Sequence, residues 1–208
     1  PPLLYYSVED NIAPKLEWLQ KRLELDDAGL RKMVRQFPAV LNLSVEGSIA
    51  PKLDWLQTRL DLDDAGLRKI MLRQFSLLGQ RVERMESNCA WLQRRLDLDA
   101  AQLKKMVVTS PSLLYLSVED NMERKLQFLA REIGLSRAEV RDLVVKDSSM
   151  LARSLASRYR PRLEACRAAG VDVKRVLSYA KQTDEGFCEK TGIAPEALVA
   201  ARESVLSV

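Results

Sequence analysis

A unit of 36–37 residues recurs along this chain of 208 residues, and its period constrains the fold more than any other feature. The motif SVED at 7–10 returns as SVEG at 44–47 and as SVED at 117–120, and LDDAGLRK occurs at 25–32 and again at 62–69. One aromatic position recurs at spacings of 37, 36 and 37 residues, in Trp18, Trp55, Trp91 and Phe128. Such a period is typical of a solenoid, in which neighbouring units bury their apolar faces against each other.

Within a unit the apolar residues follow a helical period, so we predict an all-α superhelix of about five three-helix units. Each unit has a long helix, a medium helix that opens at a residue such as Asp26, and a short turn that opens at a residue such as Pro38. Ser136 and Glu139 form a capping box for one of the medium helices. Because Pro14 lies inside the first apolar stripe and has no N–H to donate, we expect a kink or a restart there.

The repeats are predicted to occupy residues 1–182 as units of about 1–43, 44–79, 80–116, 117–153 and 154–182, followed by a C-terminal capping helix in 183–208. Helices are predicted over 8–23, 27–37, 45–60, 64–74, 82–96, 100–109, 118–133, 137–146, 155–169, 173–181 and 195–206. The third unit is irregular: Ser76 stands where Pro38 and Pro111 stand, and Ser87-Asn88 replaces a Pro-Lys pair. We expect the superhelix to bend locally there.

Composition excludes several classes of protein. The chain has no His, its three Cys form no CxxC, and its eight Gly form no phosphate-binding loop. We therefore predict that it is not an enzyme and that it binds no cofactor and no metal. No apolar run approaches the length of about 18 residues that a membrane span needs, and we expect a soluble monomer.

Basic residues recur in columns at equal repeat positions and gather in one zone. Arg31, Arg68, Lys104 and Arg141 form one column; Lys32, Lys69 and Lys105 form the next; Lys15, Lys52, Lys125 and Arg162 form a third. The zone 153–175 holds seven basic and two acidic residues, and its excess of positive charge favours an anionic partner. Stacked cations at repeat spacing suit a polyphosphate backbone, whereas the simpler interpretation is a solvated helix surface. The candidate nucleic-acid contacts are Arg31, Lys32, Arg68, Lys69, Arg73, Lys104, Lys105, Arg153, Arg158, Arg160, Arg162, Lys174 and Arg175.

The aromatic column has two interpretations. The side chains at Trp18, Trp55, Trp91 and Phe128 are suited to stacking on bases. Their place beside the Leu stripe favours a core position between helices instead, and Trp55→Ala would then cost about 3–5 kcal/mol.

The stretch LDDAGLRKMVRQFPAVLNLSVEGSIAPKLDWL (25–56) resembles the repeat of the mitochondrial transcription termination factor (mTERF) family, and residues 98–129 match the same pattern without its second Pro. The resemblance covers about 1–182. It implies a superhelix of three-helix repeats, location in a mitochondrion or chloroplast, and nucleic-acid binding on a basic concave path. We expect duplex DNA as the target in transcription termination or regulation. The alternative is a role in organellar RNA maturation or ribosome assembly, through RNA or a protein partner. The chain starts without Met and shows no targeting segment.

Overall fold

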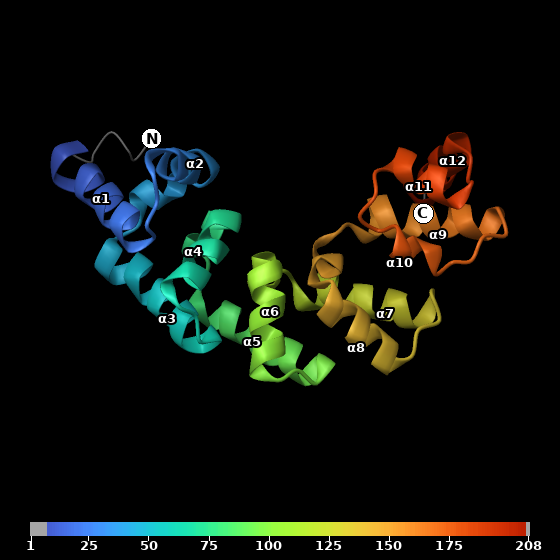
Figure 1. Ribbon diagram of the computed structural model, residues 1–208, viewed down its shortest axis with the longest axis horizontal. Helices are drawn as coiled ribbons and strands as arrows, with labels where there is room; N and C mark the ends of the chain where they lie inside the picture. Colours follow the sequence, from blue (N-terminus) through green and yellow to red (C-terminus); the bar gives the residue numbers. More distant parts are fainter. Residues whose placement is uncertain (1–7, 207–208) are drawn as a thin grey trace. The chain divides into compact units, whose positions relative to one another are not determined.

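The computed structural model describes residues 8–206, and the regular structure in that range is helical throughout, with no strand (Figure 1). The predicted all-α, helical-repeat fold is therefore confirmed. The chain divides into two compact units, residues 1–118 and residues 119–208. The first unit contains the first three predicted repeats, and the second contains the last two together with the C-terminal helices.

Each repeat opens with a helix that carries the apolar stripe. These first helices are α1 (Ala13–Arg22), α3 (Ala50–Leu60), α5 (Val82–Leu96), α7 (Arg124–Arg131) and α9 (Arg160–Ala168). All but α5 follow directly on a π-helical turn: η2 (Val8–Ile12), η4 (Val45–Ile49), η7 (Val118–Glu123) or η9 (Leu155–Tyr159). The restart expected at Pro14 is the start of α1, whose first turn contains this proline. A missing N–H is harmless in a first turn, where amides have no partner within the helix.

The third repeat lacks the π turn, and this explains its spacing of 36 residues. The core residue Leu53 lies nine positions after the N-cap Ser44, whereas Cys89 lies eight positions after the N-cap Arg81. A π turn holds one residue more than an α-helical turn. The third repeat has no π turn, so it is one residue shorter than the other repeats.

The second helices are α2 (Asp27–Gln36), α4 (Asp64–Arg73), α6 (Ala100–Thr109) and α8 (Arg137–Lys146). An oxygen of the N-cap side chain accepts a hydrogen bond from the amide three residues later in each of them, at Asp26, Asp63, Asp99 and Ser136. The predicted capping box of Ser136 and Glu139 is confirmed. These caps occupy amides that a helix start would otherwise leave without partners.

Short 3₁₀ helices close the first four repeats: η3 (Pro38–Asn42), η5 (Phe75–Gly79), η6 (Pro111–Leu114) and η8 (Ser148–Ala152). The sequence alignment of the second of these was wrong by one residue. Phe75, and not Ser76, takes the position of Pro38, since both begin the 3₁₀ turn directly after the C-cap of the second helix. The ring of Phe75 is buried, so an apolar side chain replaces the proline at that position.

One donor on each first helix, buried in every repeat except the second, where Lys52 is half-buried, bonds to a carbonyl of the turn that closes the same repeat. Lys15 donates to Leu41 at 2.5 Å, Lys52 to Leu78 at 2.6 Å and Lys125 to Leu151 at 2.5 Å. The carbonyls at the end of a 3₁₀ turn have no later amide to accept from, so a donor from another helix satisfies them. The third and fifth repeats use a different residue type at the same position, namely Asn88 and Arg162.

Arg162 is the most elaborate of these donors. Its side chain is fully buried and donates to the carbonyls of Tyr179 at 2.9 Å and Gln182 at 2.8 Å. It also pairs with Asp184 at 2.9 Å and lies 4.6 Å over the ring of Phe187. The guanidinium thus ties the end of the fifth repeat to the helices that follow it.

The C-terminal region departs from the prediction in two ways. The helix predicted over 173–181 is a single turn, α10 (Arg175–Ser178), because Arg158 and Arg162 bond to carbonyls just beyond it, including Ala180 at 3.0 Å from Arg158. An unpredicted helix, α11 (Asp184–Thr191), starts at the N-cap Thr183 and ends before Gly192. The predicted last helix is α12 (Pro195–Leu206), which packs on α9.

The aromatic column is only partly core. Phe128 is buried and its ring centroid lies 5.9 Å from that of Tyr159. Trp18, Trp55 and Trp91 are half-buried. The core interpretation is therefore correct for Phe128, but the tryptophans keep part of each ring at the surface, and the full cost of a buried Trp does not apply to Trp55.

We predict that Arg162→Met strongly destabilises the chain. The change leaves two carbonyls without their donor and removes a cation from Asp184, so the free energy of unfolding should fall by about 3–5 kcal/mol. Urea denaturation followed by circular dichroism measures it. Arg160→Met is the matched control: Arg160 is exposed two residues away, and its loss should change stability by about 0.5 kcal/mol or less. Equal effects of the two variants would contradict this role for Arg162.

We also predict an alkaline gain in stability from Lys125. Burial lowers the pKa of this ammonium from 10.5 to about 8. Between those values the unfolded chain binds more protons than the folded one, so the free energy of unfolding rises with pH. Relative to Lys125→Met, in which every other group still titrates, the wild type should gain about 2–3 kcal/mol between pH 7 and pH 10. A constant difference between the two proteins across this range would contradict the prediction.

Candidate nucleic-acid interface

The second helices of the first unit lie side by side in the order α2, α4, α6, with α1, α3 and α5 on their other side (Figure 1). Two hydrogen bonds connect neighbours in this row: Lys32 donates to the carbonyl of Leu72 at 3.2 Å, and Arg73 donates to that of Thr109 at 2.7 Å. Side chains at equal positions of the three helices therefore form a line across the row.

The first predicted column mainly joins successive repeats. Arg68 pairs with Glu24 at 3.7 Å, and Lys104 pairs with the carboxylate of Asp61 at 3.6 Å and also donates to its carbonyl. Glu24 and Asp61 follow the first helices of the preceding repeats and adopt left-handed backbone angles, with φ of 46° and 48°. Arg68 and Lys104 thus already have a carboxylate partner, which reduces what they can offer a phosphate.

Four exposed cations of this row make no ion pair and no side-chain hydrogen bond within the described residues. Two of them, Lys69 on α4 and Lys105 on α6, belong to the second predicted column, and Arg31 on α2 belongs to the first. Sequence reasoning missed the fourth, Arg35 on α2, because its repeat position holds Leu72 and Val108 in the next two units. We call Arg31, Arg35, Lys69, Arg73 and Lys105 the basic row; Arg73 is included because it is exposed and only one of its nitrogens is bonded.

Several basic side chains of the predicted zone at 153–175 make hydrogen bonds or ion pairs inside the second unit. Arg162 is buried and cannot reach a phosphate, so its prediction as a contact is wrong. Arg158 donates to the carbonyls of Ala180 and Gln182. Arg153 pairs with Asp147 at 3.3 Å, with both side chains less than one-fifth exposed.

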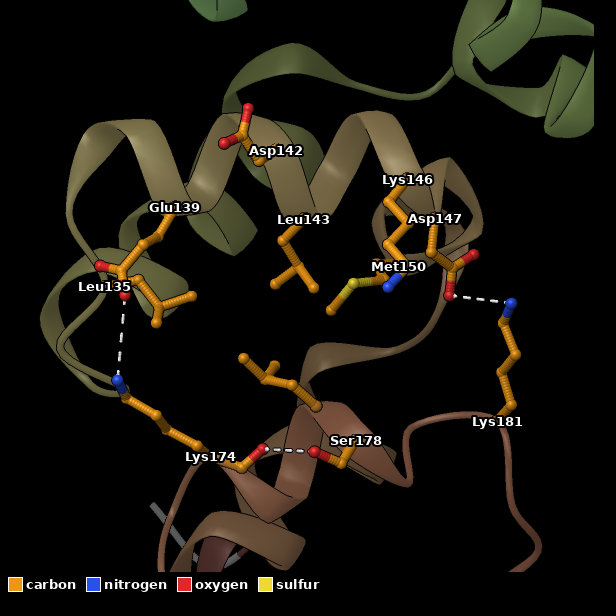
Figure 2. Close-up of a pocket in the computed structure, with 11 residues that line it drawn as sticks. Leu135, Glu139, Asp142, Leu143, Lys146, Asp147, Met150, Lys174, Ser178 and Lys181 are labelled. Atoms are coloured by element: carbon orange, nitrogen blue, oxygen red, sulfur yellow. Dashed lines mark hydrogen bonds and ion pairs between the residues drawn. The ribbon is translucent and has the colours of Figure 1, made fainter.

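The remaining members of this zone lie at the surface. Lys174 pairs with Glu139 at 3.9 Å (Figure 2), and Arg175 donates to the carbonyl of Lys190 at 3.1 Å. Arg160 is exposed and makes no ion pair in the described part of the chain. Most basic side chains of this zone therefore bond to nearby carbonyls and carboxylates of the chain.

Asp184 shows how a carboxylate inside the second unit pairs with nearby arginines. Burial opposes its ionisation, but hydrogen bonds from Arg202 at 2.5 Å and Arg162 at 2.9 Å outweigh that effect and hold the pKa below its usual value. Two arginines that add to the net charge in the sequence therefore share one internal carboxylate.

The fold and this surface define a helical-repeat protein whose stacked second helices carry a row of unpaired cations. The mTERF family model matches residues 21–187, and the chain belongs to the mTERF family. A comparison with curated protein sequences gives no match. The family is one of non-enzymatic, nucleic-acid-binding helical-repeat proteins of organellar gene expression. Among the described residues no helix has the length and apolar character needed to cross a bilayer.

Proposed function

We propose that this chain binds double-stranded DNA through the basic row and acts in transcription termination or regulation in a mitochondrion or chloroplast. The observation that carries the proposal is the set of unpaired cations on α2, α4 and α6. Membership of the mTERF family supports nucleic acid as the partner and an organelle as the setting.

The physical argument rests on spacing and on what the cations lack. Packed helices lie about 8–10 Å apart, so cations at equal positions of neighbouring repeats present charge at regular intervals. Each cation that binds a DNA phosphate displaces a condensed counterion from the DNA. The cations of the basic row make no ion pair within the described residues, so none has to be broken when they bind a phosphate. Phosphate contacts fix position and register on the nucleic acid, whereas the base sequence has to be read by other groups.

We predict that the double variant Lys69→Gln, Lys105→Gln weakens binding to a duplex and flattens its salt dependence. Each lost phosphate contact removes about 0.9 from the slope of log K against log salt on duplex DNA, so the slope should fall by about 1.8. Fluorescence anisotropy with a labelled duplex of about 20 base pairs, repeated over a salt series, measures both quantities.

The matched control is Lys21→Gln, Arg94→Gln, which removes the same charge from exposed positions on α1 and α5. This variant should keep the wild-type slope. An equal fall in both variants would show that net charge, and not the basic row, governs binding. Circular dichroism establishes that both variants keep their helix content.

The choice of duplex DNA has its own test. A structured RNA hairpin and a single strand of the same length should each compete for the labelled duplex less well than unlabelled duplex does. Stronger competition by the RNA hairpin would replace duplex DNA with RNA as the target. No salt-dependent binding of any of these nucleic acids would contradict the proposal and favour a protein-scaffold role.

A further inference from the structure

The first repeat carries an apolar face that is less buried than the same face of the next two repeats. Its residues Ile12, Leu16, Leu30 and Val34 are half-buried, and we call these four residues the end face. The equivalent residues of the second and third repeats are each at most 1% exposed, namely Ile49, Leu53, Leu67, Met71, Met85, Cys89, Leu103 and Val107. Those repeats have a preceding repeat beside them, whereas α1 and α2 lie at the end of the row in the first unit (Figure 1).

A cation on α2 lacks the partner that its equivalents have. At the repeat position of Arg31, Arg68 pairs with Glu24 of the preceding repeat at 3.7 Å, and Lys104 pairs with Asp61 at 3.6 Å. Both carboxylates directly follow the first helix of their repeat. Arg31 is exposed and makes no ion pair within the described residues, so this position calls for a carboxylate from a preceding repeat.

A carboxylate at the start of α2 lacks a partner of the opposite sign. At the repeat position of Asp27, Asp64 pairs with Arg22 of the preceding repeat at 3.0 Å. Asp27 is exposed and accepts a hydrogen bond from Gln20 of its own repeat, but it makes no ion pair in the described part of the chain. The apolar face is therefore flanked by one cation and one carboxylate, and each matches a charge that a preceding repeat supplies elsewhere in the first unit.

The sequence ahead of the first SVED motif matches the end of a repeat. PPLL at 1–4 corresponds to PAVL at 38–41 and to PSLL at 111–114, and each begins six positions before the serine of an SVE motif. The two later segments include the short turns η3 and η6, which follow the second helix of their repeat. A pair of helices ahead of PPLL would complete the same pattern.

We propose that the end face binds one further three-helix repeat of the same polypeptide, N-terminal to α1. Its second helix lies beside α2, a carboxylate after its first helix pairs with Arg31, and an arginine near the end of that helix pairs with Asp27. The row of second helices is thereby extended by one helix. This inference does not depend on the proposed binding of DNA, because the other four cations of the basic row stay exposed.

A second copy of the chain fits the end face less well. In a head-to-head contact Arg31 meets no carboxylate of the required kind, because Glu24 faces the other way and pairs with Arg68. A head-to-tail contact needs an open last repeat, and there α12 packs on α9. A further repeat of the same polypeptide therefore matches the face in both its apolar and its charged positions.

The test compares the whole chain with an extended chain, in which a copy of residues 44–74 is joined ahead of Pro1. This copy holds both helices of the second repeat, and its Asp61 and Arg59 stand at the positions of Glu24 and Arg22. Because stability in repeat proteins rises with each coupled neighbour, the extended chain should unfold in a single transition with a urea midpoint higher by roughly 0.5 M or more. Amide exchange in α1 and α2 should slow by about tenfold.

Charge reversal locates the contact. Arg31→Glu should lower the urea midpoint of the extended chain and leave that of the whole chain nearly unchanged, since only the extended chain offers Arg31 a carboxylate. Adding Asp61→Arg in the joined copy should restore the midpoint of the extended Arg31→Glu variant. Arg35→Glu is the matched control on α2, because its equivalents Leu72 and Val108 make no ion pair, and it should affect both chains equally.

Three results would overturn the proposal: a separate unfolding transition of the joined copy, an unchanged midpoint of the remainder of the chain, or an equal effect of Arg31→Glu on both chains. A dimer of the whole chain seen by sedimentation and abolished by Leu30→Gln would also overturn it, because a second copy would then cover the end face.

Discussion

The structure depends on one hydrogen bond that recurs in every repeat. A donor on the first helix reaches the carbonyl of the turn that closes the repeat, and this contact fixes both ends of the unit against each other. Lysine supplies the donor where a π turn precedes it, except in the fifth repeat, which uses Arg162; Asn88 supplies it in the third repeat, where the π turn is absent. A lost donor would leave a buried carbonyl unsatisfied, so this position tolerates few residue types. This contact holds the first helix of a repeat against the turn that follows the second helix, and it thereby helps to position the second helices in their row.

Contacts within and between the repeats also decide which cations are available to a ligand. The sequence presents three columns of lysine and arginine that look alike, but their chemistry differs. One column is bonded inside its own repeat, and another, at Arg68 and Lys104, holds the preceding repeat through carboxylates. The third leaves Lys69 and Lys105 exposed to solvent. In the second unit the equivalent position is Asp142, so this column of cations does not continue beyond α6.

Much of the fold could be predicted from sequence, because a helical period and N-cap residues are local signals. The helices around Asp26 and Ser136 follow from such signals. What failed depended on contacts between distant residues. The short α10 results from bonds that Arg158 and Arg162 make to carbonyls about 17–24 residues later. The prediction that the zone at 153–175 contacts nucleic acid failed at Arg162 for the same reason, since a count of charges does not show which side chains are buried. For the site, the columns contain Arg31, Lys69 and Lys105 of the basic row, but a repeat position alone does not separate cations without an ion pair from those that have one.

The central claim is that nucleic acid lies across α2, α4 and α6. Amide hydrogen exchange of the whole chain, with and without a saturating duplex of about 20 base pairs, tests it most directly. The account predicts slower exchange in peptides that cover these three helices, and unchanged exchange in peptides from α1, α3 and α5 and from α8. Protection confined to the first helices or to the second unit would contradict it.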